Sequence, residues 1–317
     1  MGIRWLSMGK FISVLFIISI IIFTSGCIEG LNFGEIKPKE NVEKATADIL
    51  VIQDIHTIPS SPIPAGSGPQ EFELLFTIKN LDEQKTVKNI RVELFDYSVF
   101  KSENYEPDQC SRSSSCLLLP LGQKVITFSL KTPTASEIGH VKVTPKVSFK
   151  VNYDFDGTTT YDVVVINMEE IKKLQTAGKT PDLISNKIIG SGPIKVDAEL
   201  MGDDKLILAG KTGRIKFVVK NEGSGDLVGN NVEVGGLKIT FPSGMTPEEC
   251  PEGFNCVSES TNTNKIQIYQ KESSPLIFKI ENIGDVPPIY KTFNVRTDVE
   301  YTYELRGSLD ITVEPIE

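Results

Sequence analysis

Cysteine carries the most specific chemical signal in this sequence. Four of the five cysteines form two identically spaced pairs, Cys110 with Cys116 and Cys250 with Cys256. In an exported chain this spacing predicts two local disulfides, because oxidising compartments keep thiols bonded and each pair closes one short loop. A structural zinc site is disfavoured, since such sites usually space their thiolates two to four residues apart. We therefore expect no metal ligands among these cysteines.

The other residues that could do chemistry are sparse. His56 and His140 are the only histidines, and neither has a nearby cysteine, aspartate pair or Gly-x-Ser-x-Gly motif. Asp154-Phe155-Asp156-Gly157 could begin a calcium loop, but such a loop continues with further acids and ends in glutamate. A strand that ends in an Asp-Gly turn explains these residues better. We predict that the protein is not an enzyme, with no catalytic residue, no metal and no cofactor.

Composition limits the class of protein and of partner. The 317 residues are 39% hydrophobic and 24% charged, which is typical of a globular chain with room for roughly two domains. Lysine and arginine number 33 against 42 aspartate and glutamate, so the net charge is −9. A net negative charge does not attract the phosphate backbone of a nucleic acid, so we expect no nucleic-acid partner.

The N-terminus predicts export. Residues 1–26 contain Arg4 and Lys10, then an apolar stretch over 11–24, as in a signal segment. The residues Thr24-Ser25-Gly26-Cys27 resemble a lipobox of the looser kind found in archaeal surface lipoproteins. This resemblance implies that Cys27 is lipidated and becomes the mature N-terminus.

The alternative is an uncleaved signal anchor. The apolar stretch of 14 residues is about 21 Å long as a helix, which is short for a hydrocarbon core of about 30 Å. Either anchor holds the chain on the outer face of the cell membrane. Residues 27–45 are polar and predict a tether that lets the folded part stand clear of the lipid.

An internal duplication follows the tether. Asn80 recurs as Asn221 at an offset of 141 residues, and Tyr153 recurs as Tyr301 at an offset of 148. Further matched positions lie between and around them: Ile63 with Ile207, Leu74 with Ile215, Cys110 with Cys250, Cys116 with Cys256, and Phe128 with Phe278. We predict that the two copies superpose with these residues in equivalent places.

Each copy alternates apolar and polar residues with period two, as Phe72, Leu74, Phe76 and Ile78 illustrate. The pattern predicts an all-β protein with two tandem Ig-like antiparallel sandwiches over 46–167 and 194–317. Residues 168–193 are expected to be a linker that holds one short helix. Asn167 would cap this helix, with Glu170 three residues later as in a capping box.

Two short motifs resemble the CARDB-like Ig-like domains of archaeal surface proteins. Val219-Lys220-Asn221-Glu222-Gly223 fits their strand-and-turn pattern, whereas Ile78-Lys79-Asn80-Leu81-Asp82 lacks the glycine. The resemblance covers both copies. It implies an adhesion, scaffolding or polymer-binding module with no catalytic set.

These features predict a non-catalytic, lipid-anchored surface protein that binds or scaffolds an envelope protein or surface polymer. The alternative is an accessory subunit of an envelope transport or secretion complex, and an exported hydrolase ranks third. The longest stretches without alternation, 98–122 and 242–264, are the candidate partner-binding loops. The alternative is that their disulfides serve only to stabilise these loops. The candidate contact residues are Phe100, Tyr105, Arg112, Met245 and Phe254.

Overall fold

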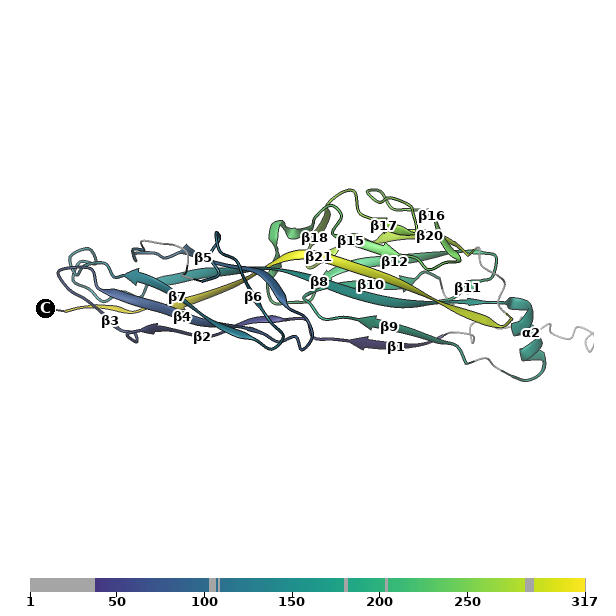
Figure 1. Ribbon diagram of the computed structural model, residues 1–317, viewed down its shortest axis with the longest axis horizontal. Helices are drawn as coiled ribbons and strands as arrows, with labels where there is room; N and C mark the ends of the chain where they lie inside the picture. The colour runs from purple at the N-terminus through teal and green to yellow at the C-terminus, as the bar shows by residue number, and fades with distance from the viewer. Residues whose placement is uncertain are drawn as a thin grey trace, which may run out of the picture.

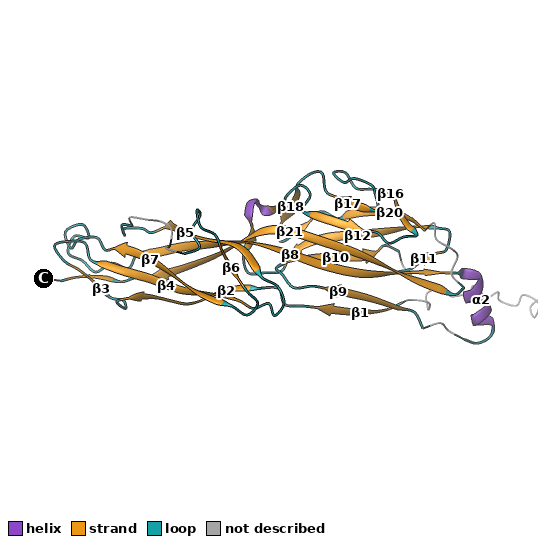
Figure 2. Ribbon diagram, in the orientation of Figure 1, coloured by secondary structure: helices purple, strands orange, loops and turns teal. Residues whose placement is uncertain are grey.

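The computed structural model is an elongated molecule built almost entirely of strands (Figures 1 and 2). It describes residues 38–102, 107, 109–179, 182–202, 205–282 and 288–316. The predicted all-β class is confirmed. The signal segment, Cys27 and Tyr105 lie outside the described residues.

Unit 1 is a sandwich of two small sheets. A three-stranded sheet in the order β2-β4-β7 faces strands β5 and β6 together with parts of two longer strands. The Phe76 and Phe149 rings stack between these layers, with centroids 3.9 Å apart. The strands of unit 1 are β2 (Leu50–Ile58), β3 (Ile63–Ala65), β4 (Glu71–Asn80), β5 (Val87–Asp96), β6 (Cys116–Leu118) and β7 (Gln123–Lys131).

Unit 2 repeats this architecture with more strands. Its inner sheet runs β14-β18-β19-β12-β20-β16, with β10 beside β12, and its Phe217 and Phe278 rings meet edge to face. The strands are β10 (Ile194–Leu200), β11 (Ile207–Leu208), β12 (Thr212–Asn221), β13 (Asp226–Leu227), β14 (Asn231–Val232), β15 (Leu237–Thr240), β16 (Met245–Glu249), β17 (Glu259–Thr261), β18 (Ile266–Tyr269), β19 (Glu272–Ser273) and β20 (Leu276–Asn282), with a 3-10 turn at Val228–Asn230.

Two strands of 21 residues, β8 (Lys146–Ile166) and β21 (Tyr290–Asp310), run through both units. They pair antiparallel along their whole length. The first part of β8 pairs with β5 of unit 1 and its later part with β9 (Ile184–Ile189), whereas β21 pairs with β15 of unit 2 before it reaches unit 1. Each unit therefore extends its last strand into the sheet of the other unit. At about 3.3 Å per residue these strands are roughly 70 Å long.

The strand register confirms the duplication. Leu74 pairs with Phe128 in unit 1 as Ile215 pairs with Phe278 in unit 2. Asp154 pairs with Thr302, its own counterpart at the offset of 148. A residue that pairs with its own copy marks a pseudo-twofold axis. We call the region around this pair the waist.

The predicted boundaries need correction. Segments 46–167 and 194–317 are not separate bodies, because β8 and β21 are shared and β22 (Val313–Pro315) pairs in parallel with β3 of unit 1. The expected tether also differs, since β1 (Lys39–Lys44) pairs in parallel with β9 at the sheet edge. The linker helix is present as α2 (Met168–Thr176), and the Asn167 side chain accepts bonds from the amides of Glu169 and Glu170.

One asparagine closes an equivalent turn in each unit. Nδ2 of Asn80 donates to the carbonyls of Lys85 and Leu119 at 2.9 and 3.0 Å, and its Oδ1 accepts from the Asp82 amide. Asn221 likewise donates to the Gly225 carbonyl at 2.8 Å and accepts from the Gly223 amide. Both side chains are buried, so these bonds are sheltered from water.

We expect Asn80→Ala and Asn221→Ala each to lower the free energy of unfolding by about 2 to 4 kcal/mol, because each change leaves buried backbone groups without a partner. Denaturant unfolding followed by circular dichroism measures this. Asn41→Ala in exposed β1 is the control and should change stability by less than about 0.5 kcal/mol. Equal effects in all three variants would contradict a turn-closing role.

Candidate functional site

The two predicted disulfides are present. Cys110 is bonded to Cys116 and Cys250 to Cys256, with Cα atoms 4.8 and 5.6 Å apart. Each bond lies within one unit, in the loop that the sequence identified. Among the described residues, no group of three or more His, Cys, Asp or Glu side chains is placed to hold a metal ion.

Two of the predicted contact residues belong to the core instead. Phe100 is 2% exposed and meets the Phe72 ring edge to face at 5.1 Å, and Met245 is 3% exposed. The prediction that they are displayed is therefore wrong. A loop without alternation can still fold its apolar side chains back over the open edge of a sandwich, where burial is more favourable than exposure.

The other predicted contact residues contribute less than expected. Phe254 is half-buried against the Phe278 ring at 5.3 Å. Arg112 is exposed, and its guanidinium pairs with Glu93 at 2.9 Å. His56 and His140 are both exposed on unit 1 and lie far apart in the sequence. None of these residues gathers into a site with another.

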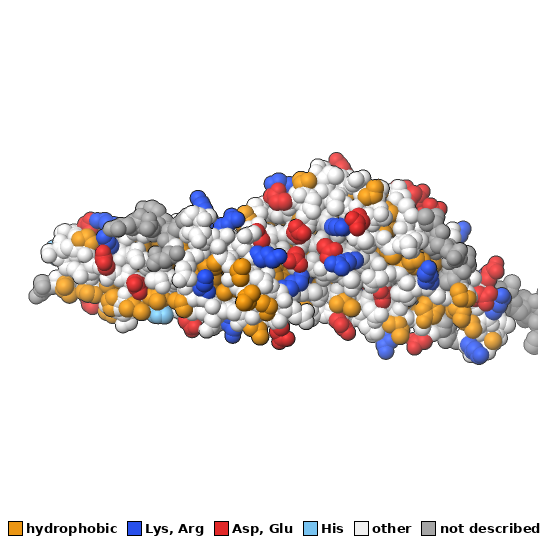
Figure 3. All heavy atoms as spheres, in the orientation of Figure 1, with side chains coloured by type: hydrophobic (Ala, Val, Ile, Leu, Met, Phe, Trp, Pro, Cys, Tyr) orange, Lys and Arg blue, Asp and Glu red, His pale blue; other side chains and the backbone are white. Residues whose placement is uncertain are grey.

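The same loop of unit 1 instead exposes three leucines. Leu117, Leu119 and Leu121 are between 56% and 63% exposed, whereas Leu118 between them is buried and pairs with Val87. We call the three exposed residues the leucine stripe. Apolar side chains gather around β6 on the face drawn in Figure 3. Clusters of exposed leucines are uncommon on the surface of a soluble protein and are typical of protein–protein contact sites.

Unit 2 provides an internal comparison for this stripe. Its counterpart of Leu118 is Ile266, which is buried and pairs with Val232 as Leu118 pairs with Val87. The residues beside Ile266 are Lys265, which pairs with Glu233 at 2.8 Å, and exposed Gln267. The fold therefore accepts polar residues at the positions of Leu117 and Leu119. The sandwich does not require leucine at either position.

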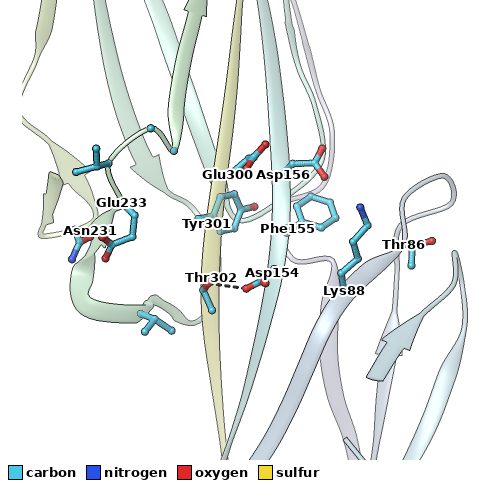
Figure 4. Close-up of a pocket in the computed structure, with 14 residues that line it drawn as sticks. Thr86, Lys88, Asp154, Phe155, Asp156, Asn231, Glu233, Glu300, Tyr301 and Thr302 are labelled. Carbon is cyan, nitrogen blue, oxygen red and sulfur yellow. Dashed lines mark hydrogen bonds between the residues drawn. The ribbon is translucent and has the colours of Figure 1, made fainter. Parts of the chain in front are cut away.

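A groove of about 540 Å³ lies at the waist on the pseudo-twofold axis (Figure 4). Residues of unit 1, unit 2 and both long strands line it. In Figure 4 the Glu300 and Asp156 carboxylates lie side by side near one end, and Thr302 bonds to Asp154 further along. Its charged residues are Lys88, Asp154, Asp156, Glu233 and Glu300.

Most of the groove carboxylates are engaged by neighbours. Asp154 accepts from Nδ2 of Asn89 and Oγ1 of Thr302, both at 2.7 Å. Asp156 pairs with Lys85 at 2.8 Å. The groove is thus rich in hydrogen-bond acceptors that suit a cationic or hydroxyl-bearing group. Of these contacts, the bond between Asp154 and Thr302 joins the two long strands, and the others lie within unit 1.

A buried lysine connects β10 of unit 2 to the segment between β1 and β2 and to the residue that follows β9. Lys195 is 2% exposed, and its Nζ donates to the carbonyls of Ala45, Thr46 and Gly190. Burial of the amino group lowers the pKa of Lys195 to about 8. Nearby, burial raises the pKa of the Tyr303 hydroxyl, which donates to Oδ1 of Asn221 at 2.8 Å.

Comparisons with known proteins leave the family of this chain open. No family model matches the chain, and no curated protein matches it. A solved structure of Escherichia coli alpha-2-macroglobulin activated by porcine elastase aligns with 84% of this chain at 9% identity and a TM-score of 0.21. The aligned region covers 33% of that protein, so this chain spans about a third of its length. A likeness at this level carries no argument about function.

No helix within the described part of the chain is both long and apolar enough to cross a membrane.

Lys195 predicts a pH dependence of stability. Between pH 8 and about 10.4 the folded chain has released a proton that the unfolded chain still binds, so the free energy of unfolding should rise with pH. We expect this rise in wild type relative to Lys195→Met, measured by urea unfolding at intervals from about pH 7.5 to 10. The variant is the control for tyrosine ionisation, which both chains share. A difference between the chains that stays flat or falls would contradict the assignment.

Proposed function

We propose that this protein is a non-catalytic, lipid-anchored cell-surface protein that binds or scaffolds another envelope component. The observation that carries the binding role is the leucine stripe, because unit 2 has Lys265 and Gln267 at the positions equivalent to Leu117 and Leu119. Exposed leucines at two positions where the other copy has polar residues favour a contact with an apolar surface of a partner protein.

The shared strands support the scaffolding role. Because β8 and β21 pair without interruption through the waist, a bend between the units would break backbone hydrogen bonds. A partner bound to unit 1 would therefore be held at a fixed orientation to unit 2. The resemblance to lipobox and CARDB-like sequences agrees with such a surface module.

The alternative is an accessory subunit of an envelope transport or secretion complex. It predicts a stable complex that co-purifies after mild detergent extraction, whereas a lone surface module extracts by itself. An exported hydrolase ranks third. It would depend on the adjacent Asp156 and Glu300 carboxylates, so Asp156→Asn and Glu300→Gln would abolish hydrolysis of a glycan or peptide panel.

We expect the double change Leu117→Lys with Leu119→Gln, which copies the residues of unit 2, to reduce recovery of the co-purifying partner at least tenfold. The melting temperature should stay within about 2 °C of wild type, because both side chains already face solvent. Recovery is measured by quantitative mass spectrometry after crosslinking and mild extraction. Val234→Ser, at an equally exposed position in unit 2, is the matched control. Unchanged recovery in the double variant would refute the stripe as the contact.

The anchor is tested separately at Cys27. Intact-mass analysis of protein from native membranes should give a chain that begins at Cys27 with added lipid mass. Cys27→Ser should leave the signal segment uncleaved or release the protein from the membrane. A wild-type chain that begins at Met1 without lipid would instead support the uncleaved signal anchor.

A further inference from the structure

The direction of β1 determines where the chain leaves the folded molecule. β1 runs parallel to β9, with Lys39 opposite Ile184 and Lys44 opposite Ile189. The Lys39 amide also donates to the carbonyl of Leu183 at 2.8 Å. Leu183 directly precedes β9, a few residues after the end of α2. The described chain therefore begins at the α2 end of unit 2. It then runs back along unit 2 to the waist before it enters unit 1.

The C-terminus lies at the opposite end of the molecule. β22 pairs with β3, and Val143 bridges to Val313, at the far end of unit 1. Figure 1 draws the C-terminus at one tip and α2 at the other. The unit that comes first in the sequence is thus the one farther from the start of the folded chain.

Chain length then limits how the molecule can stand on an anchor. Ten residues, 28–37, separate Cys27 from Pro38, where the described chain begins. Fully extended they span at most about 33 to 36 Å, roughly half the length of β8. An anchor at Cys27 can therefore hold the α2 end near the lipid, but it cannot reach the far tip of unit 1.

An apolar rim surrounds this same end. Ile184, Ile289 and Tyr290 are exposed there, and the Ile289 carbonyl accepts from the Asn167 amide that precedes α2. Tyrosine beside aliphatic residues suits the boundary between head groups and acyl chains. Apolar residues of this kind add binding energy to a lipid anchor that holds only marginally by itself.

We propose that the α2 end of unit 2 rests on the lipid surface, with its rim of Ile184, Ile289 and Tyr290 in contact with the head groups, and that unit 1 projects outward. This orientation reverses the order of the units in the sequence. It rests on the proposed membrane anchor. The leucine stripe of unit 1 is then presented away from the cell surface, where a partner protein can reach it.

The test places a donor fluorophore at either end of the full-length protein. Lys172→Cys labels α2, and Val141→Cys labels the tip of unit 1; both side chains are exposed. The protein is reconstituted in phosphatidylcholine vesicles that carry an acceptor dye on a lipid head group. We expect energy transfer from the α2 site to be at least threefold greater than from the tip. Equal transfer, or greater transfer from the tip, would overturn the orientation.

The same vesicles distinguish the orientation from the anchor. Failure of the unlabelled protein to float with the vesicles would refute the anchor, and the orientation with it. Flotation with equal transfer would refute the orientation alone. Labelling of the parent chain without an added cysteine would report a free Cys27, and would refute the lipid anchor and the orientation with it.

A second variant tests whether β1 sets the orientation. Glu43→Pro disrupts pairing at the edge of the sheet, because donors to β9 alternate along β1 from Lys39 to Ala45 and proline at 43 removes one of them; Glu43→Thr is the matched control. We expect Glu43→Pro to move the exit of the chain toward Ala45 at the waist. The difference in energy transfer between the two sites should then fall below twofold, with the melting temperature nearly unchanged. A difference that persists in a folded Glu43→Pro chain would contradict the role of β1.

Discussion

The uninterrupted pairing of β8 with β21 is the constraint on which the rest of the structure depends. Twenty-one residues of each strand face each other in one register, so neither unit completes its outer sheet without the other. Two sandwiches connected by a flexible linker would each close on their own last strand. Here the last strands cross, and the core extends as one cluster through both units. Folding of either unit is therefore coupled to folding of its copy.

This pairing also explains why the waist carries both symmetric and asymmetric features. Asp154 and Thr302 occupy equivalent positions but differ in type, so the Thr302 hydroxyl can donate to the Asp154 carboxylate at 2.7 Å. The leucine stripe is the same kind of divergence farther from the axis. A duplicated fold makes such differences informative, because one copy shows what the sandwich needs and the other shows what has been added.

Sequence patterns predicted the local structure well. Alternation identified the strands, Asn167 and Glu170 identified the helix start, and the cysteine spacing identified both disulfides. The patterns could not predict the exchange of β8 and β21, because a period of two records which face is buried and not which strand is the neighbour. β1 was missed for a related reason. All six of its residues are exposed, so the sequence of this strand resembles a polar tether.

The predicted exposure of the candidate contact residues was wrong for Phe100 and Met245. Aromatic residues in a segment without alternation were expected at the surface, yet Phe100 fills the edge of the core. The run Leu117-Leu118-Leu119 resembles a buried segment, although only its middle residue faces inward. Hydrophobicity alone cannot distinguish these cases, since burial depends on which side of the strand meets the sheet. The pairing of β1 with β9 sets the exit of the chain, and the continuous ladder of β8 with β21 fixes unit 1, which carries the stripe, relative to that exit.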